Sequence, residues 1–169
     1  METFMIIYRE LRFGDAFSYG PKNVLRLDKD QLTQIVGKNG HGKSSIGLLL
    51  EEVQFNQNSK KIKKANVLNR YTKSKTYFIE LDFDKDNDHY TISTNRSATT
   101  GTVKFTRNGI DISSHTATGT YKTIENTLGF DFTAFGQIVY QSSIASLEFL
   151  TATDTARKAF LIGLLNLTH

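Results

Sequence analysis

The chain has 169 residues, 38% of them hydrophobic and 22% charged, which are ordinary values for a globular protein with one core. Lys and Arg number 21 against 17 Asp and Glu, and this slight positive excess permits a nucleic-acid partner without requiring one. The sequence has no Cys, which excludes disulfides and zinc-thiolate sites, and it shows neither a secretory signal nor an apolar stretch long enough to span a membrane. We therefore expect a cytoplasmic protein with no membrane partner.

The first part of the chain has the predicted order hairpin, strand, glycine loop and helix. Alternating apolar residues over 4–11 and 24–27 predict two strands joined by a turn that contains the sole Pro, Pro21. The short apolar run at 32–36 predicts a third strand, which ends where the glycines begin. Apolar residues at helical spacing over 46–53 then predict an amphipathic helix.

A polar and basic stretch, residues 56–75, follows this helix. We expect it to form an exposed insertion or a mobile loop. Its densest basic run lies at 60–64, and together with Arg70, Lys73 and Lys75 this run could neutralise several phosphates of a nucleic acid. A solvated surface without a partner is the simpler interpretation, and both stay open.

Two further hairpins and a helical region complete the chain. Segments with strand periodicity lie at 77–83, 89–94, 103–106 and 110–113. The period becomes helical over 121–139, with Gly129 as a break, and a last helix is predicted to begin at Asp154. The middle of the chain is therefore expected to be antiparallel and its end helical.

The glycine loop carries the most specific motif. From Gly37 to Ser44 the sequence fits G-x-x-x-x-G-K-S, in which glycines let the backbone turn its N–H groups towards a phosphate. We expect Lys43 to reach the β- and γ-phosphates of ATP, the Ser44 hydroxyl to ligate Mg²⁺, and Ser45 to donate to the α-phosphate. The strand and helix predicted around the loop favour this interpretation over an accidental glycine-rich turn. The expected nucleotide-binding residues are Gly37, Asn39, Gly40, Gly42, Lys43, Ser44 and Ser45.

The loop GKNGHGKSSI, with the segment AFSYG at 16–20 before it, resembles the N-terminal half of the ABC-type ATPase head of recombination and repair nucleases. That family includes bacterial SbcC and the large recombination-nuclease subunits of tailed bacteriophages, and SMC proteins are more distant relatives. Segments at 78–83, 107–111, 135–141 and 149–160 are similar to the phage members in the same order. The resemblance therefore covers nearly the whole chain.

The resemblance implies an α/β fold, the P-loop NTPase of ABC type. Residues 1–130 would form its phosphate-loop lobe, with antiparallel hairpins around a central strand, loop and helix. Residues 131–169 would form a helical and glutamine-loop segment that leads towards a coiled coil, so that 1–169 would be the N-terminal half of one head. Truncation before a coiled coil that begins after Leu167 is the favoured interpretation, and a free-standing module is the alternative.

The resemblance also assigns roles to residues outside the loop. A glutamine loop in this family senses the γ-phosphate through Mg²⁺ and the attacking water, and Gln141 is the candidate for this catalytic and metal-binding role. An ungapped count places the family's glutamine nearer Ser143, and Gln137 is a competitor that we expect to face solvent. Arg12 is assigned to the base or ribose of the nucleotide.

Two elements that an ABC-type ATPase needs for hydrolysis are missing from the sequence: a Ser-Gly-Gly signature and an apolar strand ending in Asp-Glu. Asp82 alternates with apolar residues, as on a half-exposed strand, and is given no catalytic role. We therefore expect an ATP-binding head fragment of a DNA repair or recombination exonuclease ATPase subunit, with hardly any turnover alone. A second copy of the subunit, a metal-dependent nuclease subunit and DNA are the implied partners.

Two other functions stay open. A monomeric P-loop kinase or ATPase would share the glycine loop, but such enzymes usually keep parallel strands between helices, whereas hairpins follow the first helix here. A non-enzymatic DNA-binding clamp module would use the basic residues between 60 and 75.

Overall fold

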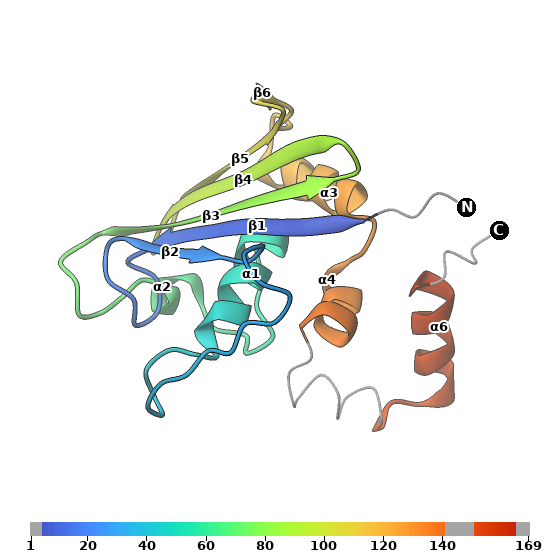
Figure 1. Ribbon diagram of the computed structural model, residues 1–169, viewed down its shortest axis with the longest axis horizontal. Coiled ribbons are helices and arrows are strands. Elements are labelled where there is room, and N and C mark those ends of the chain that lie inside the picture. Colours follow the sequence, from blue (N-terminus) through green and yellow to red (C-terminus); the bar gives the residue numbers. More distant parts are fainter. Residues whose placement is uncertain (1–4, 141–150, 165–169) are drawn as a thin grey trace. The chain divides into compact units, whose positions relative to one another are not determined.

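In the computed structural model, residues 5–140 and 151–164 are described. The chain divides into two compact units, Met1–Leu128 and Gly129–His169. The first unit contains all six strands of a single sheet together with three helices, and the second is helical (Figure 1). Among the described residues, none of the helices combines the length and the apolar composition that crossing a bilayer requires.

The six strands pair antiparallel in the order β2-β1-β3-β4-β5-β6. The strands are β1 (Ile6–Gly14), β2 (Asn23–Arg26), β3 (Thr76–Lys85), β4 (Asp88–Ser97), β5 (Gly101–Arg107) and β6 (Ile110–Asp111). The three hairpins predicted from sequence alternation are confirmed. The tight turn between β5 and β6 uses Asn108 and Gly109, whose φ angles of 50° and 81° are the positive values that a two-residue hairpin turn requires.

One face of the sheet is apolar because its strands alternate buried and more exposed residues, most regularly along β3. On this face Phe83, Tyr90 and Phe105 stack across three neighbouring strands, with successive ring centroids 5.2 and 5.7 Å apart. The helices of the first unit are α1 (Ser45–Phe55), α2 (Lys64–Val67) and α3 (Ala117–Leu128). Helices α1 and α3 pack on the sheet and on each other, and bury Leu49 and Ile124 completely.

Helix α1 continues directly from the glycine loop, so its attachment to the sheet determines where the loop lies. Leu49 and Val53 are fully buried, and burial of an apolar side chain of this size contributes roughly 1.5–3 kcal/mol. The Tyr8 hydroxyl on β1 donates a hydrogen bond to Gln54 Oε1 on α1 at 2.6 Å. The helix ends at Asn56, which has the left-handed φ of 57°. The helix predicted after the loop is thereby confirmed.

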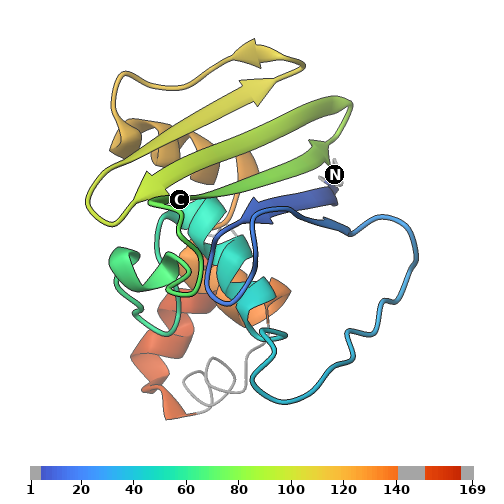
Figure 2. The same cartoon turned by 90° about the vertical axis from the view of Figure 1, so that its left-hand side faces the viewer.

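The strand predicted over 32–36 does not form. This segment has no strand pairing in the structure, and Leu32 and Val36 are 89% and 79% exposed. In Figure 2 the blue-to-cyan chain between β2 and α1 runs as a long loop beside the sheet. A strand needs a neighbour that pairs with its backbone N–H and C=O groups, and no segment within the described ranges supplies one here. The prediction of a strand, loop and helix is therefore wrong in its first element.

The basic stretch between α1 and β3 was expected to be an exposed insertion or a mobile loop. Its residues Lys60, Lys61 and Lys63 are exposed, as expected, but two buried carboxylates of α1 hold the start of the stretch in place. Glu51 accepts hydrogen bonds from the backbone N–H and the hydroxyl of Ser59, at 2.8 and 3.1 Å. Glu52 accepts from the Asn58 side chain at 2.6 Å and forms an ion pair with Lys64. Burial raises the pKa of Glu51, although the bonds from Ser59 act in the opposite direction. The stretch is thus an ordered part of the first unit.

The second unit is helical where it is described, as predicted. Its elements are α4 (Phe132–Ala134), the π-helix η1 (Phe135–Val139) and α6 (Asp154–Leu164). Gly129 has a φ of 79° and separates α3 from α4, which confirms the predicted break. The Asp131 carboxylate accepts a hydrogen bond from the N–H of Ala134 at 2.8 Å and so caps α4. The last helix begins at Asp154, as its sequence indicated.

Replacing Lys64 by Ala is expected to lower the free energy of unfolding by about 2 kcal/mol, because the buried Glu52 carboxylate loses its cationic partner. The Lys64 side chain is 30% exposed, which keeps the loss below that of a fully buried pair. Urea denaturation followed by circular dichroism measures the difference. Lys63→Ala is the control because Lys63 is exposed, and an equal loss in both variants would contradict the prediction.

Candidate functional site

A cleft of about 520 Å³ lies beside the glycine loop. Its lining residues are Phe17, Ser18, Asn39, Gly40, Gly42, Lys43, Ser44, Ser45, Lys60, Asn66, Leu68, Arg70 and Tyr71. They come from three separate parts of the sequence: the turn between β1 and β2, the loop with the start of α1, and the basic stretch that contains α2. The cleft has the size of a small-ligand site.

Two glycines of the loop have backbone conformations that other residues adopt only at a cost. Gly40 and Gly42 have φ angles of 80° and 86°. A Cβ atom on Gly42 would lie 2.7 Å from Ser18 Oγ and 3.2 Å from Tyr19 Cζ, closer than real Cβ atoms normally approach. The φ angle of Gly42 therefore favours glycine, and any larger residue there would also displace the Ser18 and Tyr19 side chains of the β1–β2 turn.

The Lys43 ammonium group is folded back over the loop. Its Nζ donates to the carbonyl oxygens of Gly37 and Lys38, at 2.6 and 2.9 Å. Phosphate oxygens bond an ammonium group more strongly than neutral carbonyls do, so a bound triphosphate can replace these acceptors. Ser44 and Ser45 line the cleft at the N-terminus of α1, where the helix dipole favours an anion. These groups fit a polyphosphate.

Tyr19 supports the loop from the side of the β1–β2 turn. Its hydroxyl donates to the carbonyl oxygen of Gly42 at 2.9 Å, and its ring packs edge-on against Phe13 with centroids 4.8 Å apart. Burial raises the pKa of Tyr19, so the phenol keeps the proton that it donates. Its own carbonyl oxygen accepts from the Asn69 side chain at 2.8 Å. The turn thus contacts both the loop and the basic stretch.

The structure brings almost all of the predicted loop residues to one cleft. Six of them line it directly: Asn39, Gly40, Gly42, Lys43, Ser44 and Ser45. Gly37 contributes the carbonyl oxygen that accepts from Lys43. The sequence analysis did not assign Phe17, Leu68 or Tyr71 to the cleft, and it considered Arg70 only as a contact for DNA phosphates, because no local spacing shows that these residues lie beside the loop. The only signal was the AFSYG segment, which contains Phe17 and entered through the resemblance.

Of the three glutamine-loop candidates, only Gln137 lies among the described residues. It lies in η1 and is half-buried, with its side-chain oxygen buried, so the expectation that it faces solvent holds only in part. Gln141 and Ser143 lie outside the described residues.

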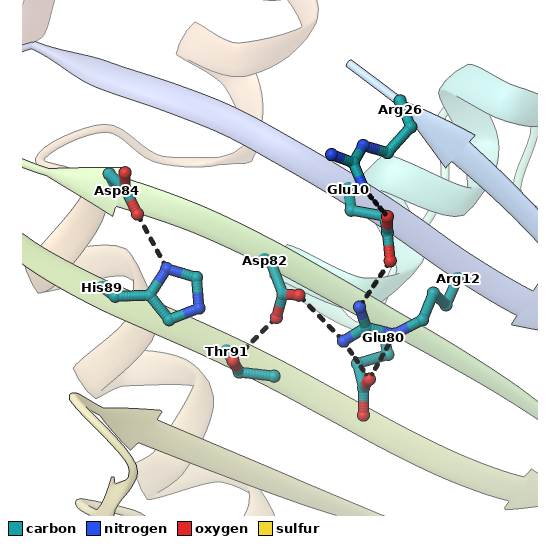
Figure 3. A network of polar contacts seen from close by, with 8 residues as sticks. All are labelled: Glu10, Arg12, Arg26, Glu80, Asp82, Asp84, His89 and Thr91. Carbon is teal, nitrogen blue, oxygen red and sulfur yellow. Dashed lines mark hydrogen bonds and ion pairs between the residues drawn. The ribbon is translucent and has the colours of Figure 1, made fainter. Parts of the chain in front are cut away.

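Arg12 lies in an ion network on the outer, charged face of the sheet and is not among the residues that line the cleft (Figure 3). Its guanidinium group bonds Glu10 at 2.6 Å, Glu80 through Nε at 2.7 Å, and Asp82 at 2.8 Å. Leu11 and Leu81, the paired neighbours of this cluster, point to the opposite face and are fully buried. The position of Arg12 gives no support to a contact with base or ribose.

The same face carries a second group of ion pairs. Asp84 accepts a hydrogen bond from Arg9 Nε at 2.8 Å. It also lies 2.7 Å from His89 Nδ1 (Figure 3). These contacts, the one with His89 foremost, hold the pKa of Asp84 below its usual value. Asp82 also accepts from the Thr91 hydroxyl at 2.7 Å. The acidic residues of β3 therefore stabilise cross-strand pairing, which is consistent with giving Asp82 no catalytic role.

No family model matches the chain. It is 43% identical over 161 residues to the "Probable exonuclease subunit 2" of Escherichia phage T5, an alignment that covers 95% of this chain and 26% of the phage protein. It is 25% identical to the "Exonuclease subunit 2" of Escherichia phage RB69, over 98% of this chain and 29% of that protein. The "Exonuclease subunit 2" of Enterobacteria phage T4 is 26% identical over 92% of this chain and 28% of its own length. The chain thus spans less than a third of the length of these relatives.

The fold also resembles that of several solved structures. A structure described under "Structural biochemistry of ATP-driven dimerization and DNA stimulated activation of SMC ATPases" superposes with a TM-score of 0.67 at 21% identity, over 93% of this chain and 98% of that chain. The recombination mediator protein RecF in its ATP complex superposes with a TM-score of 0.56 at 13% identity, over 70% of this chain and 31% of that chain. At these identities the likeness concerns the fold alone.

The fold and the comparisons together define the class of protein. The chain has the fold of an ABC-type ATPase head, a P-loop NTPase, as the sequence predicted. Over nearly its whole length it is similar in sequence to part of the exonuclease subunits 2 of phages T5, RB69 and T4.

Replacing Arg12 by Met is expected to leave nucleotide affinity unchanged and to lower the free energy of unfolding by about 1 kcal/mol, because three carboxylates lose their shared cation on a partly exposed surface. Isothermal titration with ATP and urea denaturation measure the two effects. Arg26→Met is the matched control, since Arg26 is 66% exposed at the edge of the same network. A loss of ATP affinity in Arg12→Met alone would restore the predicted contact with the nucleotide.

Proposed function

We propose that the chain is the ATP-binding head fragment of a DNA repair or recombination exonuclease ATPase subunit. The observation that carries the proposal is the cleft in which the glycine loop, Lys43 and Ser44 meet at the start of α1. The homology with exonuclease subunit 2 of three phages supports the link to a nuclease. In such a subunit, ATP held between two heads would control the grip on DNA and the activity of a metal-dependent nuclease partner.

Each loop residue would bind a different part of the triphosphate. Gly40 and Gly42 let backbone N–H groups turn inward, and Lys43 neutralises the β- and γ-phosphates. Ser44 would hold Mg²⁺, which would further neutralise the phosphate charge, and Ser45 would donate to the α-phosphate. Gln141 is retained as the proposed sensor of the γ-phosphate and ligand of the metal.

This site would be one half of a composite one. The sequence contains neither Ser-Gly-Gly nor Asp-Glu, and the relatives extend well beyond the matched part. The unpaired segment before the loop exposes Leu32, Ile35 and Val36 by 89%, 46% and 79%. Three apolar side chains on a segment with unpaired backbone suit a strand that pairs with another part of a longer protein. The hydrolytic groups would come from that part and from a second copy of the subunit.

Replacing Lys43 by Ala is expected to weaken ATP binding by roughly ten- to a hundredfold, because the phosphates lose charge-assisted bonds. Isothermal titration in the presence of Mg²⁺ measures the affinity. Lys38→Ala is the matched control: it removes an equal charge from the same loop, but the Lys38 side chain does not line the cleft. Equal affinities for Lys43→Ala and the unchanged chain would contradict nucleotide binding at this loop.

Hydrolysis is expected only when the rest of the subunit is present. The chain alone should turn ATP over at the rate of the Lys43→Ala variant, whereas the full-length subunit should hydrolyse ATP faster when DNA is added. A coupled phosphate-release assay with and without DNA measures both. DNA-independent phosphorylation of a small acceptor would favour a monomeric kinase, and DNA binding unaffected by ATP would favour a clamp that uses the basic stretch.

A further inference from the structure

Part of the cleft wall consists of apolar and aromatic side chains, which phosphate binding does not need. Beyond the loop, the wall is formed by Phe17 and Leu68 and, at the rim, by Arg70 and Tyr71. Tyr71 is 93% exposed, although an aromatic side chain of this size is usually at least partly covered. An apolar and aromatic wall with a cation beside it is suited to the flat, polarisable ring of a nucleobase.

The backbone of this wall is held in place by hydrogen bonds between the β1–β2 turn and the basic stretch. Phe17 N–H donates to the carbonyl oxygen of Val67 at 2.5 Å, and Asn69 N–H donates to that of Asp15 at 2.8 Å. Phe17 has a φ of 53°, which residues with a side chain adopt only at a cost, so the surrounding bonds impose this conformation. Strained residues of this kind gather at ligand sites.

Hydrogen bonds also hold the backbone of the exposed part of the wall and the Arg70 side chain. The side-chain oxygen of Asn69, a residue that is only 5% exposed, accepts from the Tyr71 N–H at 2.8 Å. Arg70 donates to the Asn66 side chain at 2.7 Å, which holds the cation at the cleft. The Asn69 side chain also donates to the carbonyl oxygen of Tyr19, whose hydroxyl bonds the phosphate loop. The aromatic wall and the loop are thus parts of one hydrogen-bonded frame.

We propose that Phe17 and Tyr71, with Arg70 beside them, form the surface on which the base of the bound nucleotide stacks. This inference rests on the proposed nucleotide site, and it states that the aromatic wall contacts the base of the nucleotide. It assigns the base to these residues in place of Arg12, which the ion network holds on the outer face of the sheet. Since a purine offers a larger ring face than a pyrimidine, ATP should bind more tightly than CTP.

The test separates the base from the phosphates by comparing ATP with inorganic tripolyphosphate, both with Mg²⁺, in isothermal titration. Tyr71→Ala is expected to weaken ATP binding by roughly five- to a hundredfold and to leave tripolyphosphate binding unchanged. Tyr71→Phe keeps the ring and is expected to retain the affinity of the unchanged chain. Tyr71 is exposed, so its replacement should not unfold the protein.

Two results would overturn the assignment. Unchanged ATP affinity in Tyr71→Ala, or equal weakening of ATP and tripolyphosphate, would show that the ring makes no contact with a base. Failure of the nucleotide site itself gives a different pattern, in which the unchanged chain binds neither ligand or Lys43→Ala binds both as well as the unchanged chain does. In that case both the base-stacking surface and the proposed function would be wrong.

Discussion

The burial of α1 against one face of the antiparallel sheet is the interaction on which the rest of the first unit depends. Leu49 and Val53 are fully covered there, and the Tyr8 hydroxyl on β1 bonds Gln54 on the helix. Because the helix follows the glycine loop without a gap, fixing its apolar side also fixes the direction of its N-terminus. The glycine loop is therefore presented by a rigid helix, even though the chain before it has no strand pairing.

Helix α1 also carries two carboxylates at buried positions, where apolar residues would be expected. Glu51 and Glu52 are buried, and hydrogen bonds from Ser59 and Asn58 together with the ion pair to Lys64 hold them there. Their bonds hold the start of the basic stretch, whose later residues form the wall of the cleft. Buried polar contacts on one side of α1 thus position the part of the site that lies across from the phosphate loop.

The two faces of the sheet have separate physical roles. On the inner face, aromatic rings stack across the strands, and helices α1 and α3 pack over this face. On the outer face, cross-strand ion pairs centred on Arg12 link the strands. This separation explains why Arg12 and Asp82, which carry suitable chemistry, make their contacts away from the cleft. It also explains why the acidic residues of β3 are compatible with a strand whose alternate positions are entirely apolar.

Short-range patterns were sufficient for the three hairpins, for α1, and for the phosphate-loop residues from Asn39 to Ser45, because period, turn residues and motif spacing act within about ten positions. They were insufficient for the segment at 32–36, since an apolar run forms a strand only when a neighbour pairs with it. Tertiary structure alone decided that Phe17 and Tyr71 share a cleft with Lys43, and that Arg12 does not. The physical reason is that such contacts depend on long-range hydrogen bonds and ion pairs, which leave no periodic trace in the sequence.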